Sequence, residues 1–187
     1  MIGNTRVEVR RLAGYVAGYA MVFILASTLA WPALAAGIPQ ARDLAHEARN
    51  AARAGVPLVV FFSQPDCEYC EQARHEYLEP MLADPSGRAR LRLVEVNIGD
   101  PAPLVDFAGR RVSHVDFARA QRVRLFPTLA FFGPRGRPLA APLVGLGLSD
   151  FYQQYLDRRI EQAHDSLRAG PLISQPPGRA AQATAGG

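Results

Sequence analysis

The sequence predicts an α/β domain with a central mixed β-sheet and helices on both of its faces. Residues 58–63 (LVVFFS) form a continuous apolar run, which is typical of a strand buried on both faces. Residues 90–98 alternate between apolar and polar side chains and predict a second central strand. The stretch between these two segments has helical character, so together they predict a βαβ unit with a parallel core.

The N-terminus has the layout of a secretory signal. Residues 1–11 are positively charged, residues 12–34 carry no charge, and Pro32 stands just before the small residues Ala33 and Ala35. This pattern predicts a signal peptide over residues 1–35, cleaved after Ala35, and a periplasmic mature protein. The alternative is an uncleaved anchor in the inner membrane, because residues 12–34 are long enough to span a bilayer.

Next come an N-terminal extension and the helix between the two strands. Within the extension, residues 36–56, residues 40–54 predict an additional helix that Gly55 ends. Residues 67–81 predict the connecting helix, which should bend or break at Pro80.

The second half of the domain predicts one helix, a hairpin and a closing helix. Residues 99–112 read as an irregular insertion, and Ser113 resembles the start of a capping box before a helix over residues 113–123. Residues 128–132 and 139–144 predict a hairpin. Ser149 then caps an amphipathic helix, and residues 170–187 predict a disordered tail. The apolar face of that helix is formed by Phe151, Tyr155, Leu156, Ile160 and Ala163.

Charge argues against a nucleic-acid-binding protein. The chain of 187 residues has a net charge of +4. Half of that excess lies before residue 36, and the remaining arginines are interleaved with acids. Such a surface offers no basic stripe for phosphates. His46, His114 and His164 have no partners in the sequence pattern and are expected at the surface.

The only two cysteines, Cys67 and Cys70, stand where the buried strand passes into a helix. A helix N-terminus lowers the pKa of the first thiol, and two intervening residues bring the second sulfur within bonding reach. A disulfide closing so small a loop stabilises a fold little, so a chemical role is favoured. Glu71 stands where a c-type haem site needs histidine, and His75 is the only further ligand nearby, which disfavours zinc. A copper or zinc chaperone using both thiolates remains an alternative.

These features resemble the thioredoxin family. The resemblance rests on the C-x-x-C after VVFFS, Pro127-Thr128 opening a hairpin, the Gly-rich break and the closing helix, and it covers residues 57–169. It implies a thioredoxin fold in which Pro127 is cis, lies beside the dithiol and binds substrate backbone, with Phe126 offering backbone groups. Tyr69 and Phe126 could add an apolar lip. An exported chain of this kind looks like periplasmic thioredoxin-related proteins, including the SoxW type.

Several positions depart from the family pattern. Asp66 replaces the usual tryptophan, Glu68-Tyr69 replaces Gly-Pro, and Phe61 stands where the family has a buried acid. Proton transfer must therefore use Asp66, Glu68 or water. These two carboxylates flank Cys67 and disfavour its thiolate, which predicts a more negative potential and a reducing role.

The sequence thus predicts an exported thiol–disulfide oxidoreductase that reduces disulfides of exported proteins through Cys67 and Cys70. A disulfide oxidase or isomerase of the same fold is the alternative within the family. The expected partners are protein disulfides and a membrane electron donor. No cofactor, metal site or nucleic acid is expected, and membrane association is expected only if the signal segment stays uncleaved.

Overall fold

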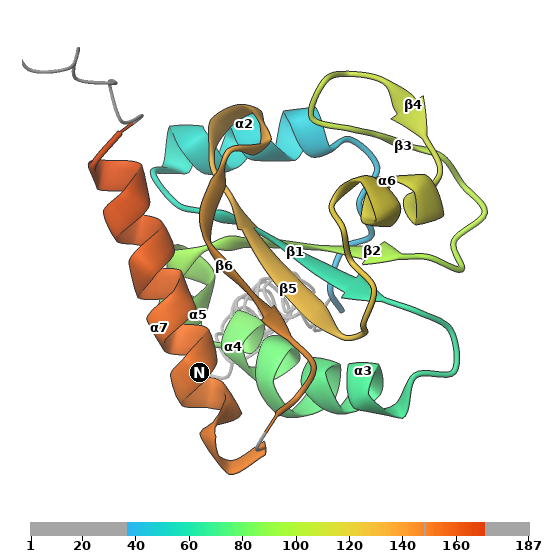
Figure 1. Ribbon diagram of the computed structural model, residues 1–187. Helices are drawn as coiled ribbons and strands as arrows, with labels where there is room; N and C mark the ends of the chain where they lie inside the picture. Colours follow the sequence, from blue (N-terminus) through green and yellow to red (C-terminus); the bar gives the residue numbers. More distant parts are fainter. Residues whose placement is uncertain (1–36, 148, 171–187) are drawn as a thin grey trace, which may run out of the picture. The chain divides into compact units, whose positions relative to one another are not determined.

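The computed structural model describes residues 37–147 and 149–170 of the chain. The expected signal segment and all but the first residue of the expected tail lie outside this part. Four strands form the central sheet in the order β2-β1-β5-β6 (Figure 1). Strand β1 (Leu58–Ser63) is parallel to β2 (Arg92–Asn97) and antiparallel to β5 (Thr128–Phe132), which pairs antiparallel with β6 (Pro138–Val144). The predicted mixed sheet is confirmed.

Helices cover both faces of this sheet (Figure 1). Helices α2 (Leu44–Ala54) and α6 (His114–Ala120) pack on one face. On the other lie α7 (Ser149–Arg168) and the chain of short helices between β1 and β2. That chain consists of α3 (Glu68–Ala73), the π-helix η1 (Arg74–Leu78), α4 (Glu79–Ala83) and α5 (Pro85–Arg90).

Strand β1 is buried on both faces because its apolar run feeds two separate cores. Leu58, Val60 and Phe62 face the core under α2 and α6, whereas Val59 and Phe61 face the core under α3 and α7. All six residues of the strand are buried. Each fully buried large apolar side chain contributes roughly 1.5–3 kcal/mol, so β1 anchors the sheet energetically as well as geometrically.

The first helix is shorter than the sequence predicted. Helix α2 begins at Leu44 because the Asp43 carboxylate accepts a hydrogen bond from His46 N at 2.7 Å, and it ends at Gly55, whose φ is 69°. The residues before it run beside β2 instead. Ala41 N donates to Glu95 O at 2.7 Å, and Glu95 N donates to Pro39 O at 2.8 Å.

The helix after β1 also differs from the prediction. It does not run unbroken to Pro80, because it widens into the five-residue π-helix η1 at Arg74. Pro80 is the second residue of α4, which follows η1 directly. The sequence analysis missed α5, which starts after the Asp84 cap.

The segment predicted to be irregular forms an ordered hairpin, so that expectation is wrong. Strands β3 (Leu104–Val105) and β4 (Arg111–Val112) pair antiparallel around Asp106, whose carboxylate accepts bonds from Ala108 N and Arg110 N, both at 2.9 Å. Phe107 of the turn packs against the rings of Phe117 and Phe132. Two-residue strands are too short to show an alternating pattern in the sequence.

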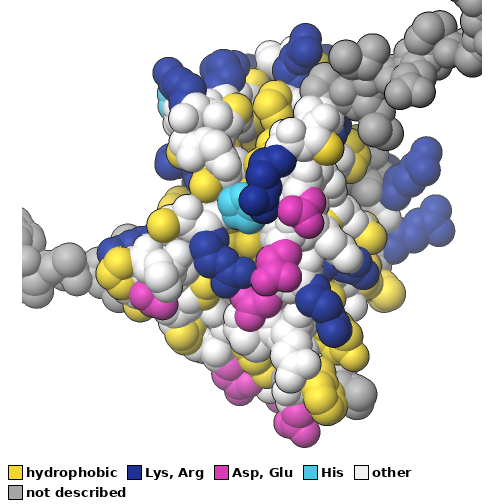
Figure 2. Space-filling model, turned by 90° about the vertical axis from the view of Figure 1, so that its left-hand side faces the viewer, with side chains coloured by type: hydrophobic (Ala, Val, Ile, Leu, Met, Phe, Trp, Pro, Cys, Tyr) yellow, Lys and Arg dark blue, Asp and Glu magenta, His cyan; other side chains and the backbone are white. Residues whose placement is uncertain are grey.

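Helix α7 buries three of the five residues expected on its apolar face, together with Tyr152, and leaves the other two exposed. Tyr152, Leu156, Ile160 and Ala163 are buried, whereas Phe151 and Tyr155 are exposed. Figure 2 shows basic and acidic side chains interspersed on the face that it displays, as the charge pattern predicted. Within residues 37–147 and 149–170, no helix is long and apolar enough to cross a membrane.

His114 is not a surface residue, contrary to the prediction. It begins α6 and is fully buried, with its Nε2 3.9 Å from Asp100 Oδ2. His164 is half-buried and its Nε2 is 2.7 Å from Arg90 O, while His46 is exposed. Burial lowers the pKa of His114 below its usual value, and the nearby Asp100 opposes this effect in part.

The buried His114 predicts a loss of stability in mild acid. The unfolded chain binds this proton more readily than the folded protein does. The contribution of neutral His114 to the free energy of unfolding is therefore fully present above about pH 6.5 and falls as the pH drops toward the lowered pKa. We expect His114→Leu to flatten the dependence of the urea midpoint between pH 7.5 and 5. His46→Leu, at an exposed position, should retain the wild-type slope. An unchanged slope in His114→Leu would contradict this assignment.

Candidate functional site

The two cysteines form a disulfide at the start of α3, the helix that follows β1 in the chain. Cys67 is the N-cap residue, and its Sγ accepts a hydrogen bond from Cys70 N at 3.1 Å. The Cα atoms of the pair are 5.2 Å apart. This placement gives the first sulfur a backbone donor and the positive end of the helix dipole, both of which favour a thiolate.

The two sulfurs differ in access. Cys67 keeps 9% of its surface exposed, whereas Cys70 is fully buried in the core under α3 and α7. An incoming disulfide can therefore meet Cys67 first, while Cys70 stays behind it within bonding reach. The arrangement suits a nucleophilic first cysteine and a resolving second cysteine.

The loop before β5 lies at the same end of the sheet as the dithiol. Thr128 pairs with Phe62, so the residues preceding Thr128 and those following Ser63 leave the sheet together. The Phe126–Pro127 peptide bond is cis, as the resemblance implied. Pro127 is buried, and its carbonyl accepts a hydrogen bond from Gly145 N at 2.7 Å. Phe126 packs against the core that contains both cysteines.

The side chains expected around the dithiol are exposed. Asp66, in a left-handed conformation with φ 54°, and Glu68 both face solvent. Tyr69 is 62% exposed, which leaves it available to a partner. Leu125, which the sequence analysis missed, is 65% exposed two residues before Pro127. An apolar residue beside the X-Pro pair was the signal that could have identified it.

A buried charged cluster under the same helix was also missed. Glu95 of β2 accepts two hydrogen bonds from the Arg74 guanidinium, at 2.6 and 2.8 Å. Ser63 Oγ and Gln40 Nε2 also donate to this carboxylate. The hydrogen bond from Arg74 to Glu95 raises the pKa of Arg74, so the guanidinium stays charged at every working pH. A glutamate at an inward position of an alternating strand was the available signal.

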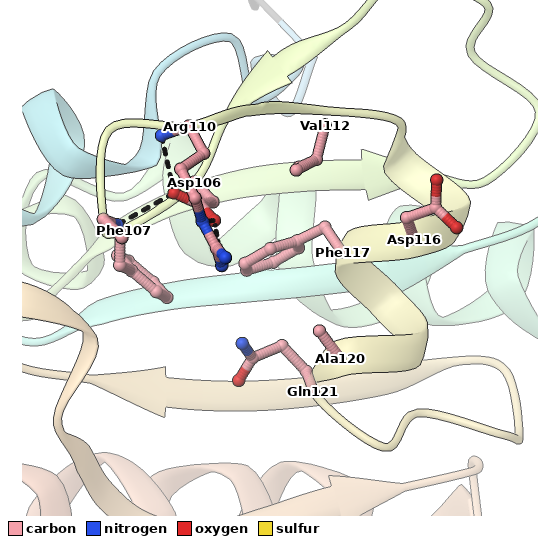
Figure 3. Close-up of a pocket in the computed structure, with 9 residues that line it drawn as sticks. Asp106, Phe107, Arg110, Val112, Asp116, Phe117, Ala120 and Gln121 are labelled. Carbon is pink, nitrogen blue, oxygen red and sulfur yellow. Dashed lines mark hydrogen bonds and ion pairs between the residues drawn. The ribbon is translucent and has the colours of Figure 1, made fainter.

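Two of the hollows in the described part of the chain lie under the β3–β4 hairpin and along β5 and β6. One, of about 160 Å³, lies between the β3–β4 hairpin and α6, where Figure 3 shows Phe107, Phe117 and the Asp106–Arg110 ion pair. The other, of about 300 Å³, is a groove between residues 121–125 and strands β5 and β6. Neither is lined by a cysteine, although Leu125 is among the residues that line the groove.

Metal ligands are sparse around the dithiol. His75, the nearest histidine in sequence, is exposed and interacts with Glu79 at 2.8 Å and Glu71 at 3.3 Å. In the described part of the chain, no group of three or more His, Cys, Asp or Glu side chains could hold a metal ion. A metal bound here would depend on the two sulfurs and on ligands from elsewhere.

Comparison with known proteins relates the chain to thioredoxins. The family model described as a thioredoxin-like domain matches residues 44–159. The reduced periplasmic thioredoxin SoxS from Paracoccus pantotrophus is 25% identical over 57% of this chain and 98% of its own, with a TM-score of 0.40. Oxidized mitochondrial thioredoxin 3 from Saccharomyces cerevisiae is 18% identical over 66% and 93%, with a TM-score of 0.44. No functionally curated protein matches the sequence significantly.

The exposed carboxylates beside Cys67 predict a small shift in redox potential when they are removed. Together, Asp66→Ala and Glu68→Ala should make the midpoint of the Cys67–Cys70 couple less negative, because the thiolate loses two repelling charges. Each exposed charge contributes at most about 1 kcal/mol, which limits the shift from removing both to about 40 mV.

The measurement is equilibration in glutathione buffers followed by thiol trapping. A matched control, Glu161→Ala with Asp165→Ala on α7, removes the same charge far along the chain and should leave the midpoint unchanged. Equal shifts in both double variants would refute a local effect of Asp66 and Glu68.

Proposed function

The chain belongs to the thioredoxin-like domain family, and on that basis we propose that it is an exported thiol–disulfide oxidoreductase that reduces disulfides of exported proteins. The asymmetric dithiol supports this proposal most directly. Cys67 is the accessible sulfur and receives the Cys70 N–H, while Cys70 is buried directly behind it. Such a pair can attack and then resolve a foreign disulfide.

The reaction begins with the reduced pair. The Cys67 thiolate attacks one sulfur of the substrate disulfide, forms a mixed disulfide and releases the other substrate sulfur as a thiolate. Cys70 then loses its proton and attacks Cys67 Sγ, which breaks the mixed disulfide and releases the second substrate thiol. The substrate gains two electrons and two protons, and the disulfide seen between Cys67 and Cys70 is the product state.

Substrate backbone would bind along the loop of Phe126 and Pro127, next to the dithiol. Two exposed apolar side chains, Tyr69 in the first turn of α3 and Leu125 in the loop before β5, would cover the apolar parts of the substrate. Because both side chains are exposed to solvent, they can contact a substrate disulfide that lies in an unfolded or flexible segment more readily than one that is buried in a folded substrate.

The reducing direction rests on Asp66 and Glu68, which oppose a negative charge on Cys67. Turnover then requires a dithiol donor, for which we propose a membrane electron donor. Export and a periplasmic location rest on the pattern of residues 1–35. The SoxW type is the subfamily that this combination of export signal and C-x-Y-C favours. A disulfide oxidase or isomerase is the alternative within the family, and a copper or zinc chaperone the alternative outside it.

Covalent trapping tests this function. With insulin as the disulfide substrate, Cys70→Ser should accumulate a mixed disulfide that dithiothreitol releases, because no resolving thiol remains. Cys67→Ser should form no adduct, and both variants should lose multiple turnover. His46→Ser, at an exposed position on α2, should reduce insulin as the wild type does.

Two results would count against the proposal. An adduct formed equally by Cys67→Ser would contradict the assignment of the nucleophile. A wild-type protein that retains copper or zinc and never turns over would support the chaperone instead.

A further inference from the structure

A buried ion pair lies under the helix that carries the dithiol. Glu95 is 1% exposed and Arg74 is 14% exposed, and the two side chains are joined by two hydrogen bonds. Ser63 and Gln40 donate further hydrogen bonds to the carboxylate. Such a pair is held in one geometry, because a charge without its partner is costly to bury.

Several contacts connect this pair to the cysteines. Arg74 follows Cys70 by four residues, its backbone N–H donates to Cys70 O, and side chains four apart on a helix are neighbours. The guanidinium carbon lies 5.3 Å from the centroid of the Phe61 ring, and Phe61 shares one apolar core with both cysteines. Phe61 is also the β1 residue that pairs with Glu95. The ion pair therefore lies on the dithiol's face of the sheet.

Few other charges oppose or support Arg74. Glu71 Oε2 lies 3.2 Å from Arg74 Nε, but its side chain is 55% exposed, so Glu71 opposes Arg74 more weakly than the buried Glu95 does. His75 is exposed and faces Glu71 and Glu79. Among the described residues, the buried charges that these contacts place beneath the dithiol are thus one guanidinium and one carboxylate.

Reduction changes the charge that this pair experiences. The disulfide is neutral, whereas the reduced dithiol carries a negative charge when its nucleophile is a thiolate. In a poorly solvated interior, a nearby cation stabilises that charge and a nearby carboxylate opposes it. A pair with fixed geometry can therefore set the relative stability of the oxidised and reduced forms.

We propose that Arg74 is a positioning residue that stabilises the reduced, thiolate-bearing dithiol, and that its counter-ion Glu95 limits this effect. The inference rests on the proposed function and adds a residue that tunes it. It assigns the two members of one ion pair opposite effects on the redox potential, whereas a contact that only joins η1 to β2 would not produce opposite effects.

The test compares two neutral variants in glutathione buffers. Arg74→Met leaves Glu95 alone behind the dithiol and should favour the disulfide about tenfold, a midpoint about 30 mV more negative. Glu95→Gln leaves the guanidinium unbalanced and should shift the equilibrium about tenfold the other way. The conservative variant Arg74→Lys keeps the charge and should stay within about twofold of the wild type.

A matched control is the half-exposed ion pair between Arg90 of α5 and Asp157 of α7, which are 2.6 Å apart. Arg90→Met and Asp157→Asn should leave the midpoint unchanged. Shifts of Arg74→Met and Glu95→Gln in the same direction, or no shift in folded variants, would overturn the proposal. A wild-type pair that never cycles reversibly would instead overturn the proposed function.

If either neutral variant fails to fold, Glu71→Gln carries the test, because Glu71 is exposed and its removal leaves the core intact. Losing this weaker counter-ion of Arg74 should favour the reduced form about two- to threefold. An unchanged midpoint in Glu71→Gln would then overturn the proposal.

Discussion

The burial of β1 on both faces is the constraint on which the rest of the structure depends. Its alternating side chains belong to two different cores, so a shift by one residue would move each set into the opposite core and disrupt the packing of both. That fixed register determines where β1 ends, and Cys67 follows four residues beyond Ser63 as the N-cap of α3. The same register pairs Phe62 with Thr128, so the loop of Pro127, which precedes Thr128, lies at the end of the sheet where the dithiol is.

Two sets of charges lie near this dithiol, and the burial of each set determines how strongly it acts on the charge of the thiolate. Asp66 and Glu68 are adjacent to Cys67 in sequence, but water screens them. Arg74 and Glu95 are further along the chain, yet they are held together in a poorly solvated core. The position of the family's buried acid is occupied by Phe61, and the buried carboxylate of Glu95 lies opposite Phe61 on the neighbouring strand. Proximity in sequence is therefore a poor guide to which charge tunes the site.

The sequence predicted the fold and the cysteine pair because both follow from local patterns. The apolar run of β1, the alternation of β2 and the C-x-x-C between them are all visible in short windows. The features that it missed depend on long-range contacts. Glu95 and Arg74 find each other across 21 positions, His114 is buried beneath α6, and the β3–β4 hairpin is held by Phe107 against residues distant in the chain. The alternation of β2 indicates that Glu95 points inward, but no local pattern identifies the residue that pairs with it.

The central claim is that Cys67 and Cys70 form a reversible, reducing redox couple. The most direct test is the midpoint of the wild-type protein, equilibrated across a series of thiol and disulfide buffers before its free thiols are trapped. We predict a reversible two-electron transition near about −270 mV, in the range of thioredoxin-like reductants. A midpoint near about −120 mV would make the protein an oxidant of exported proteins, and the absence of any reversible transition would contradict the oxidoreductase account.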